Sequence, residues 1–110
     1  MDSDIPVIAR RLREARQRLG ISQYALGVAA GIDEMSASPR VNQYERGKHA
    51  PDFQMVQRLA AVLQVPAGYL FTEDDDLAEA LVILGTLPGE ERRCLVEELR
   101  KLAAELASSG

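Results

Sequence analysis

Apolar residues recur at spacings of three and four along most of the chain, which is the period of an amphipathic helix. The first stripe consists of Ile5, Ile8, Leu12, Ala15 and Leu19. Gly20 follows it, and glycine commonly ends helices. The other faces of this segment carry Arg10, Arg11, Arg13 and Arg18. We therefore expect a helix over residues 5–19 with its arginines in solvent.

Four further short helices are expected before residue 72, each placed by a capping residue or a stop signal. The expected N-terminal caps are Ser22, Ser38 and Asp52. Pro39 and Pro66 each open a helix, since proline is favoured at the first helical position. Gly31 and Gly47 each end one. The apolar faces of these helices are expected to include Leu26, Ala29, Ala30, Val41, Tyr44, Phe53, Val56, Ala60, Leu63, Tyr69, Leu70 and Phe71.

Two more helices are expected after the acidic segment at residues 72–76. The apolar residues of the first are Leu77, Leu81 and Leu84, and those of the second are Leu95, Leu99, Leu102 and Leu106. Between them, Leu87-Pro88-Gly89 interrupts helix and restarts it. Because no segment alternates as a strand would, the sequence predicts an all-α fold. It consists of a five-helix domain over residues 1–72 and a two-helix C-terminal hairpin over residues 73–110.

Charge is divided unevenly between these two parts. Residues 1–70 contain nine Lys or Arg and seven Asp or Glu, whereas residues 71–110 contain four and ten, in a chain whose net charge is −4. An anionic partner such as nucleic acid is therefore expected to bind the N-terminal part, with the acidic part facing away from it. The acidic segment at residues 72–76 is explained equally well as a joint and as a cap on the next helix.

Composition excludes several classes of protein. The chain has 110 residues and one cysteine, Cys94, so it forms no intrachain disulfide. The longest run of large aliphatic residues, 81–84, is far too short to span a membrane. His49 and Cys94 each lack neighbours at ligand or catalytic spacing, and Cys94 is expected to pack against other side chains. We therefore expect a cytoplasmic protein that is not an enzyme and has no metal, cofactor or membrane partner.

The third helix carries side chains that can read bases. If Val41 and Tyr44 face inward, a rotation of about 100° per residue directs another set of side chains outward. That set is Pro39, Asn42, Gln43 and Arg46, with Arg40 on its flank. Asn and Gln can pair with adenine and Arg with guanine, each pair contributing roughly 1–3 kcal/mol of discrimination. A plain solvated helix face has a similar composition, so this helix alone leaves both interpretations open.

Several motifs across the N-terminal part add to this pattern. They are Leu12-Arg13-Glu14-Ala15-Arg16, Leu19-Gly20-Ile21-Ser22-Gln23, Ala30-Gly31-Ile32, Tyr44-Glu45-Arg46-Gly47-Lys48 and Val65-Pro66-Ala67-Gly68-Tyr69-Leu70-Phe71. Together they resemble the phage Cro/repressor-like (XRE) helix-turn-helix family over about residues 7–71. The resemblance implies a five-helix domain that binds double-stranded DNA.

The resemblance also implies roles for individual residues. It implies that Gln23 contacts a backbone phosphate, helped by Ser22 and the positive end of the second helix. It implies that Glu45 pairs with Arg16 and holds the reading helix at a fixed angle. The phosphate candidates are Ser22, Gln23, Ser38, Arg46 and Lys48, and the base-reading candidates are Pro39, Arg40, Asn42 and Gln43.

One stretch departs from the family pattern. The glycine corresponding to Gly31 normally stands about four residues closer to the Glu-Arg-Gly motif. The extra length lies within residues 33–38, and it predicts a longer connection in place of the tight turn. Tyr24 and Val28 are apolar where the family usually has polar side chains. We hypothesise that Ile32 and Met35 fold back onto these two residues.

The C-terminal helices present more apolar surface than a hairpin can hide by packing on itself. Their partner is either the N-terminal domain or the same hairpin of a second copy. A homodimer is expected, because two copies can read half-sites roughly 34–36 Å apart. The expected interface residues are Leu81, Leu84, Leu95, Leu99, Leu102 and Leu106.

The sequence therefore predicts a homodimeric transcriptional regulator that binds specific double-stranded DNA, in the simplest case a repressor that blocks polymerase. One alternative is an antitoxin whose C-terminal helices bind a toxin protein. Another is a helical adaptor that keeps the fold and binds proteins through the polar face. A steep loss of DNA affinity with salt would distinguish the DNA-binding proteins from the adaptor.

Overall fold

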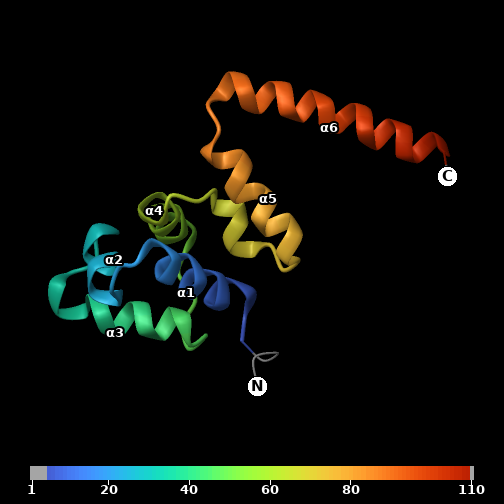
Figure 1. The fold of residues 1–110 in the computed structure, drawn as a ribbon. Helices are drawn as coiled ribbons and strands as arrows, with labels where there is room; N and C mark the ends of the chain where they lie inside the picture. Colours follow the sequence, from blue (N-terminus) through green and yellow to red (C-terminus); the bar gives the residue numbers. More distant parts are fainter. Residues whose placement is uncertain (1–4, 110) are drawn as a thin grey trace.

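The computed structural model describes residues 5–109, and all regular structure in this range is helical. The elements are α1 (Val7–Leu19), α2 (Gln23–Ala29), α3 (Glu34–Glu45), α4 (Phe53–Leu63), the 3-10 helix η2 (Ala67–Phe71), α5 (Asp75–Thr86) and α6 (Gly89–Ser109). The predicted all-α fold is confirmed. Residues 1–4 of the predicted N-terminal domain lie outside the described residues. The elements from α1 to α5 gather in one body, whereas α6 extends away from it (Figure 1).

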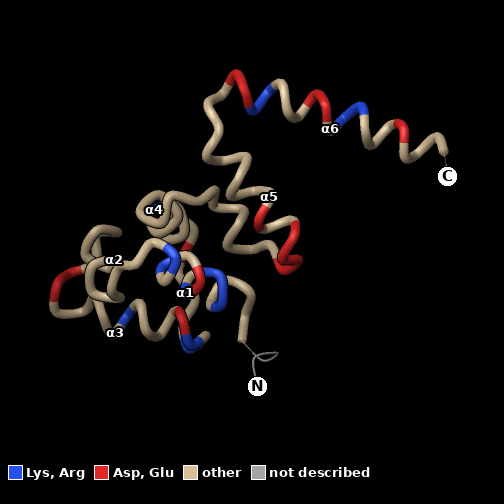
Figure 2. The backbone as a smooth tube through the Cα atoms, viewed as in Figure 1, with Lys and Arg blue, Asp and Glu red and all other residues tan. Residues whose placement is uncertain are grey.

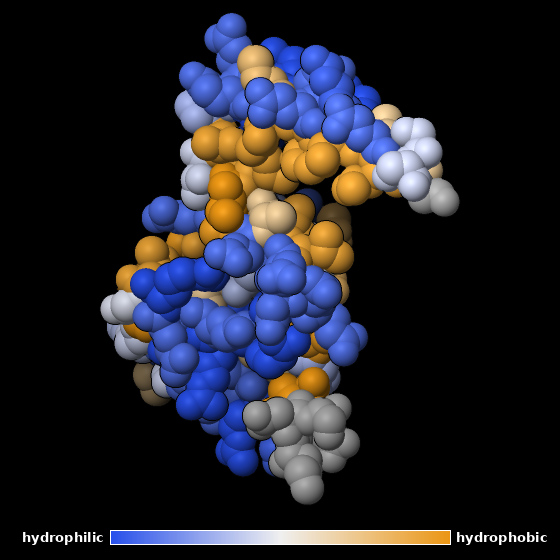
Figure 3. Space-filling view, turned by 45° about the vertical axis from the view of Figure 1, so that its right-hand side comes forward, coloured by the Kyte–Doolittle hydropathy of each residue, from blue (hydrophilic) through white to orange (hydrophobic). Residues whose placement is uncertain are grey.

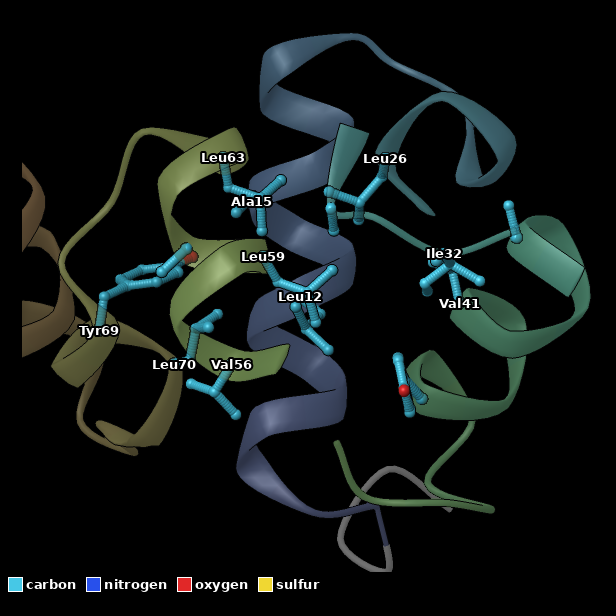
Figure 4. Packing of buried hydrophobic residues seen from close by; sticks show 14 of the residues in the cluster. Leu12, Ala15, Leu26, Ile32, Val41, Val56, Leu59, Leu63, Tyr69 and Leu70 are labelled. Atoms are coloured by element: carbon cyan, nitrogen blue, oxygen red, sulfur yellow. The ribbon is translucent and has the colours of Figure 1, made fainter. Parts of the chain in front are cut away.

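Helix α1 lies at the centre of the body, between α4 and η2 on one side and α2 and α3 on the other (Figure 4). The buried core consists of Leu12, Ala15, Leu26, Ala30, Ile32, Ala37, Val41, Tyr44, Val56, Leu59, Ala60, Leu63, Tyr69, Leu70 and Ala78. The apolar stripes predicted for α1, α3 and α4 thus supply most of it. Phe53 and Phe71 were expected on buried faces and are exposed. Each stands at the end of its element, beyond the edge of the core.

Most of the predicted helix ends are confirmed. The hydroxyl of Ser22 accepts a hydrogen bond from the backbone N–H of Ala25 at 2.9 Å, and Asp52 caps α4 in the same way. Asp74 caps α5, its carboxylate accepting from the N–H of Leu77 at 2.9 Å. The acidic segment is therefore a helix cap with its carboxylates at the positive end of the helix dipole.

The predicted start of the third helix is wrong. Helix α3 begins at Glu34 instead of after Ser38, because Asp33 is the N-cap and its carboxylate accepts from the N–H of Met35 at 3.0 Å. Pro39 lies inside the helix rather than at its first position. Proline removes the donor for the carbonyl four residues earlier, which belongs to Met35. Met35 is 87% exposed, so water can hydrogen-bond to its carbonyl in place of that donor.

The extra residues of this chain are therefore helical. The connection between α2 and α3 is only residues 30–33, so the predicted long loop is absent and the turn stays tight. The exposure of Met35 also contradicts the hypothesis that it covers Tyr24, which is itself exposed. Ile32 is buried in the core, and Val28 packs against that core.

Arg11 was expected in solvent and is buried, with 3% of its surface exposed. Its guanidinium donates to the carbonyl oxygens of Thr72 and Glu73, both at 2.8 Å, and to the carboxylate of Asp75 at 3.0 Å. Burial works against its charge, but the hydrogen bond to Asp75 and the charge of Glu14 outweigh this, and the pKa of Arg11 is raised. Arg11 therefore joins α1 to the start of α5.

The two C-terminal helices are present, but they do not form the predicted hairpin. Helix α5 packs on the body, where Ala78 is buried and Leu81 and Val82 contact the core. Helix α6 turns away from α5 (Figure 1), and none of its described residues is buried. Cys94, expected to be packed, is exposed. The reason lies at the corner between the helices, where Arg92 binds the end of α5.

Candidate nucleic-acid interface

Helices α2 and α3 cross in direct contact at Gly27. A Cβ atom on Gly27 would lie 2.8 Å from the Cβ of Ala37 and 2.9 Å from its carbonyl oxygen. Only glycine therefore fits at this crossing. The carbonyl of Gly27 also accepts a hydrogen bond from the N–H of Ile32 at 2.9 Å, which closes the turn between the helices. Two helices joined by a tight turn form the frame of a helix-turn-helix unit.

Helix α3 has one buried and one outward face. Ala37, Val41, Tyr44 and Glu45 are buried. Of the predicted base-reading residues, Pro39, Arg40 and Gln43 are exposed and Asn42 is half-buried. Among the predicted phosphate contacts, Ser22, Arg46 and Lys48 are exposed, while Gln23 and Ser38 are half-buried. The outward face of α3 is thus free to enter a groove.

A buried ion pair attaches the end of α3 to α1. Nε of Arg16 donates to one carboxylate oxygen of Glu45 at 2.6 Å, and its Nη2 donates to the other at 3.0 Å. The side chain of Glu45 is only 3% exposed. The hydrogen bond and charge of Glu45 raise the pKa of Arg16 despite burial. Arg16 also donates to the carbonyl of Ile21 at 3.0 Å, so it ties α1, the start of α2 and α3 together.

Gln23 extends this network toward the outward face. Its amide nitrogen donates to Glu45 at 3.1 Å and to the side-chain oxygen of Asn42 at 3.2 Å. Both amide hydrogens of Gln23 are therefore used inside the protein, and only its oxygen, an acceptor, is left. Among residues 5–109 the amide nitrogen of Asn42 has no acceptor, so its two hydrogens can be donated to a ligand. Gln23 thus orients Asn42 through a contact that the sequence did not reveal.

The C-terminal end of α3 is fixed by Gly47. This residue has a φ of +74°, and a Cβ atom there would lie 2.7 Å from Cδ of Pro6. Both the left-handed conformation and the close contact require glycine. Beyond it, the N–H of Lys48 donates to the carbonyl of Gln43 at 2.9 Å. The charged side chains of Arg46 and Lys48 therefore leave the end of α3 from a fixed turn.

Residues 5–109 contain neither a cluster of metal-ligating side chains nor a membrane-spanning helix. No group of three or more His, Cys, Asp or Glu side chains in residues 5–109 is arranged to hold a metal ion. His49 is exposed. Along the same described range, no helix combines the length and the apolar composition needed to cross a bilayer. Lys and Arg positions occur along α1 and at the end of α3, and Asp and Glu positions gather at the start of α5 (Figure 2).

Residues 12–70 match the model of a helix-turn-helix family. The chain belongs to this family. A solved structure described as the transcriptional regulator BswR is 43% identical, covering 93% of this chain and 98% of its own, with a TM-score of 0.81. No curated protein matches the chain. These findings confirm the helix-turn-helix resemblance and support DNA binding in transcriptional regulation.

The sequence did not predict the burial of Arg11 or the helix crossing at Gly27. Of the two residues, only Arg11 stands in a sequence pattern that could have indicated its role. Arg11 stands four residues after Val7 and four before Ala15, on the edge of the apolar stripe. A charged residue at that position could have been recognised as a candidate for burial. Gly27 carries no such signal, because its role depends on the crossing of two helices.

Proposed function

We propose that this helix-turn-helix protein is a cytoplasmic, homodimeric repressor that binds specific double-stranded DNA. The observation that carries the proposal is the division of α3 into a buried face and an outward polar face. Val41 and Tyr44 hold the helix in the core, while Gln43 and Arg40 project outward. A helix presented in this way fits the major groove, where amide and guanidinium groups distinguish the bases.

Two sets of side chains would share the work of binding. Pro39, Arg40, Asn42 and Gln43 would face the base edges, with Asn42 using the amide nitrogen that Gln23 leaves free. Ser22, Arg46, Lys48 and the half-buried Ser38 would meet phosphates on either side of the groove. Gln23 itself can donate to a phosphate only if it releases Asn42 or Glu45. We therefore assign it first to holding the reading helix, and second to phosphate.

A homodimer would supply the contacts that one unit lacks. A single DNA-binding module buries roughly 600–1,000 Å² of protein surface, which is little for selecting one site in a genome. Two copies would read two half-sites of a palindrome on one face of the duplex. The candidate dimer residues remain Leu81, Leu84, Leu95, Leu99, Leu102 and Leu106. The last three are exposed and Leu95 is half-buried, which supports an interface on α6.

Genomic mapping of bound sites, followed by binding to the recovered duplexes, tests this function. We expect a palindrome with half-site centres roughly one helical turn, or a multiple of it, apart. The affinity should fall steeply with salt, by about 0.9 in log K per log unit of salt for each neutralised phosphate. Transcription from a promoter containing the palindrome should fall when the protein is added. Binding that is insensitive to salt, or absent for every duplex, would exclude a DNA-binding regulator and favour a protein adaptor.

A further inference from the structure

An apolar cleft opens where α4, α5 and the first turn of α6 meet. Its walls include Ala61, Val65 and Pro66 on the α4 side and Leu81, Leu84 and Gly85 on the α5 side, and its volume is about 790 Å³. We call it the α4–α5 cleft. An open apolar surface of this kind on a folded body indicates a contact with another surface.

Helix α6 carries the matching apolar surface. Its stripe of Leu95, Leu99, Leu102 and Leu106 lies on one side of a 21-residue helix. Hydrophobic side chains cover the side of α6 that faces the body (Figure 3). Within residues 5–109, Leu99, Leu102 and Leu106 stay exposed and Leu95 is only half-buried, so most of this stripe is uncovered.

The corner between α5 and α6 keeps the stripe out of the cleft of its own chain. Nε of Arg92 donates to the carbonyl of Leu84 at 2.8 Å, and its Nη2 donates to that of Leu87 at 2.9 Å. Both carbonyls lie at the C-terminal end of α5, where helices leave acceptors without intrahelical partners, and that of Leu84 also accepts from the N–H of Leu87 at 3.3 Å. Only Leu87 and Pro88 separate the two helices. Folding α6 back against the body would break both hydrogen bonds, which hold the two-residue link in its present turn.

We infer that the α4–α5 cleft receives α6 of a second copy, and that the exchange is reciprocal. Each chain carries both halves of the contact, an apolar helix and an apolar cleft. Within one chain, the hydrogen bonds of Arg92 at the α5–α6 corner keep the helix away from the cleft. Two copies related by a two-fold axis satisfy both halves at once and close the assembly. This inference rests on the proposed homodimer and adds that its interface reaches α4, inside the DNA-binding body. The partner's α6 would therefore set the spacing of the two reading helices directly.

A charged side chain placed in either the α4–α5 cleft or the α6 stripe should weaken the dimer. Ala61 is exposed in the cleft and Leu102 is exposed in the stripe, so Ala61→Glu and Leu102→Glu should leave the body folded. Sedimentation should give the unaltered chain twice its 12.1 kDa mass, and each variant should raise the dimer dissociation constant by about tenfold or more. Ala29→Glu and Ala104→Glu are matched controls at exposed sites outside the cleft and stripe, and should remain dimeric.

Mixing the two variants distinguishes exchange from simpler pairing. The Ala61→Glu chain still donates an intact α6, and the Leu102→Glu chain still offers an intact cleft. An equimolar mixture should therefore associate, with one of the two contacts restored, although neither variant does so alone. An Ala61→Glu chain as dimeric as its control would mean that two α6 stripes pair with each other, and would overturn the inference. A mixture that stays monomeric would overturn it as well, because one intact helix and one intact cleft would then have failed to associate.

Failure of the inference can be told from failure of the proposed function. Binding to a duplex with one half-site depends on α3 and should be the same for Ala61→Glu and the unaltered chain. Loss of that binding in the unaltered chain would count against the regulator itself. An unaltered chain that is monomeric, or that gains mass only with a different protein, would overturn the exchange and favour a protein partner such as a toxin.

Discussion

Helices α1 and α6 carry the same kind of apolar stripe, but the stripe of α1 is buried and that of α6 is largely exposed. Leu12 and Ala15 of α1 are buried, because the connections that follow α1 fold α2, α3 and α4 against it. Leu99, Leu102 and Leu106 of α6 stay exposed, because that helix turns away from the body at a corner that Arg92 binds. The periodicity of a helix thus identifies its apolar face, and the chain connections decide what covers that face.

The two regions also differ in their ion pairs, and this difference predicts the largest effect. Glu45→Ala should destabilise the fold by up to about 3–5 kcal/mol, because it leaves the half-buried Arg16 without its partner. It also removes an acceptor of Gln23. Glu97→Ala is the control, since Glu97 pairs with Arg100 on the surface of α6 and such pairs contribute about 1 kcal/mol or less. Denaturant unfolding measures both, and equal effects would contradict a structural role for the buried pair.

Glycine substitutions in the body and in α6 are expected to differ in their effect on stability, and this is the next largest predicted difference. Gly27→Ala gains about 1 kcal/mol of helix propensity. It also places a methyl group against the Cβ and backbone of Ala37, and overpacking of this kind costs about 1–3 kcal/mol. We expect net destabilisation, because the Cβ and the backbone atoms of Ala37 cannot move away from the added methyl group by a side-chain rotation.

Gly89→Ala, at the start of α6, is the matched control. A Cβ atom there meets nothing within 4 Å, so the change should be neutral or slightly stabilising. Thermal unfolding of both variants gives the comparison. A Gly27→Ala protein as stable as Gly89→Ala would mean that α2 and α3 can separate without cost.

The sequence predicted those parts of the fold and site that depend on local chemistry. Capping by Ser22 and Asp52 and the inward positions of Val41 and Tyr44 follow from spacing and residue type. The pairing of Arg16 with Glu45 followed from the resemblance to a known family, and the structure contains it. Ser38 was expected to be the cap because proline follows it, and Asp33 was not considered, although its side chain has equally good capping chemistry and is the actual N-cap.

What escaped prediction depends on distant parts of the chain. Arg11 is buried because Thr72, Glu73 and Asp75 return to it some sixty residues later. The engagement of Gln23 with Asn42 depends on the crossing of α2 and α3. Neither contact has a period or a cap that a single stretch of sequence would reveal.

Two glutamine variants distinguish the role of the exposed face of α3 from that of the hydrogen bonds that Gln23 makes to Asn42 and Glu45. Gln43 is exposed, so Gln43→Ala should leave stability unchanged and reduce base preference at one position by about 1–3 kcal/mol. Gln23→Ala should weaken binding to every sequence alike, because it removes support from Asn42 and Glu45. Binding to a set of duplexes with single base changes measures both. Equal effects on all sequences would show that Gln43 does not face the bases.

Acid should weaken the junction of the two regions, with the smallest effect. The hydrogen bond from Arg11, followed by that from Arg10, lowers the pKa of Asp75 below its ordinary value. Because the folded pKa lies below the unfolded value of about 3.9, the contribution of Asp75 is complete above that pH and is lost as the pH falls through the folded pKa. The effect is small because the Asp75 carboxylate is exposed to solvent.

An NMR titration of the Asp75 carboxyl carbon measures this directly. Its midpoint should lie below the ordinary aspartate pKa of about 3.9 in the unaltered chain, because Arg11 and Arg10 lower the pKa of this carboxyl. In Arg10→Gln the midpoint should rise part of the way toward that value, because Arg11 still donates to the same oxygen. A midpoint at or above that ordinary value in the unaltered chain would mean that Arg11 holds α5 through the carbonyls of Thr72 and Glu73 alone. The attachment of α5 to α1 would then be independent of pH in this range.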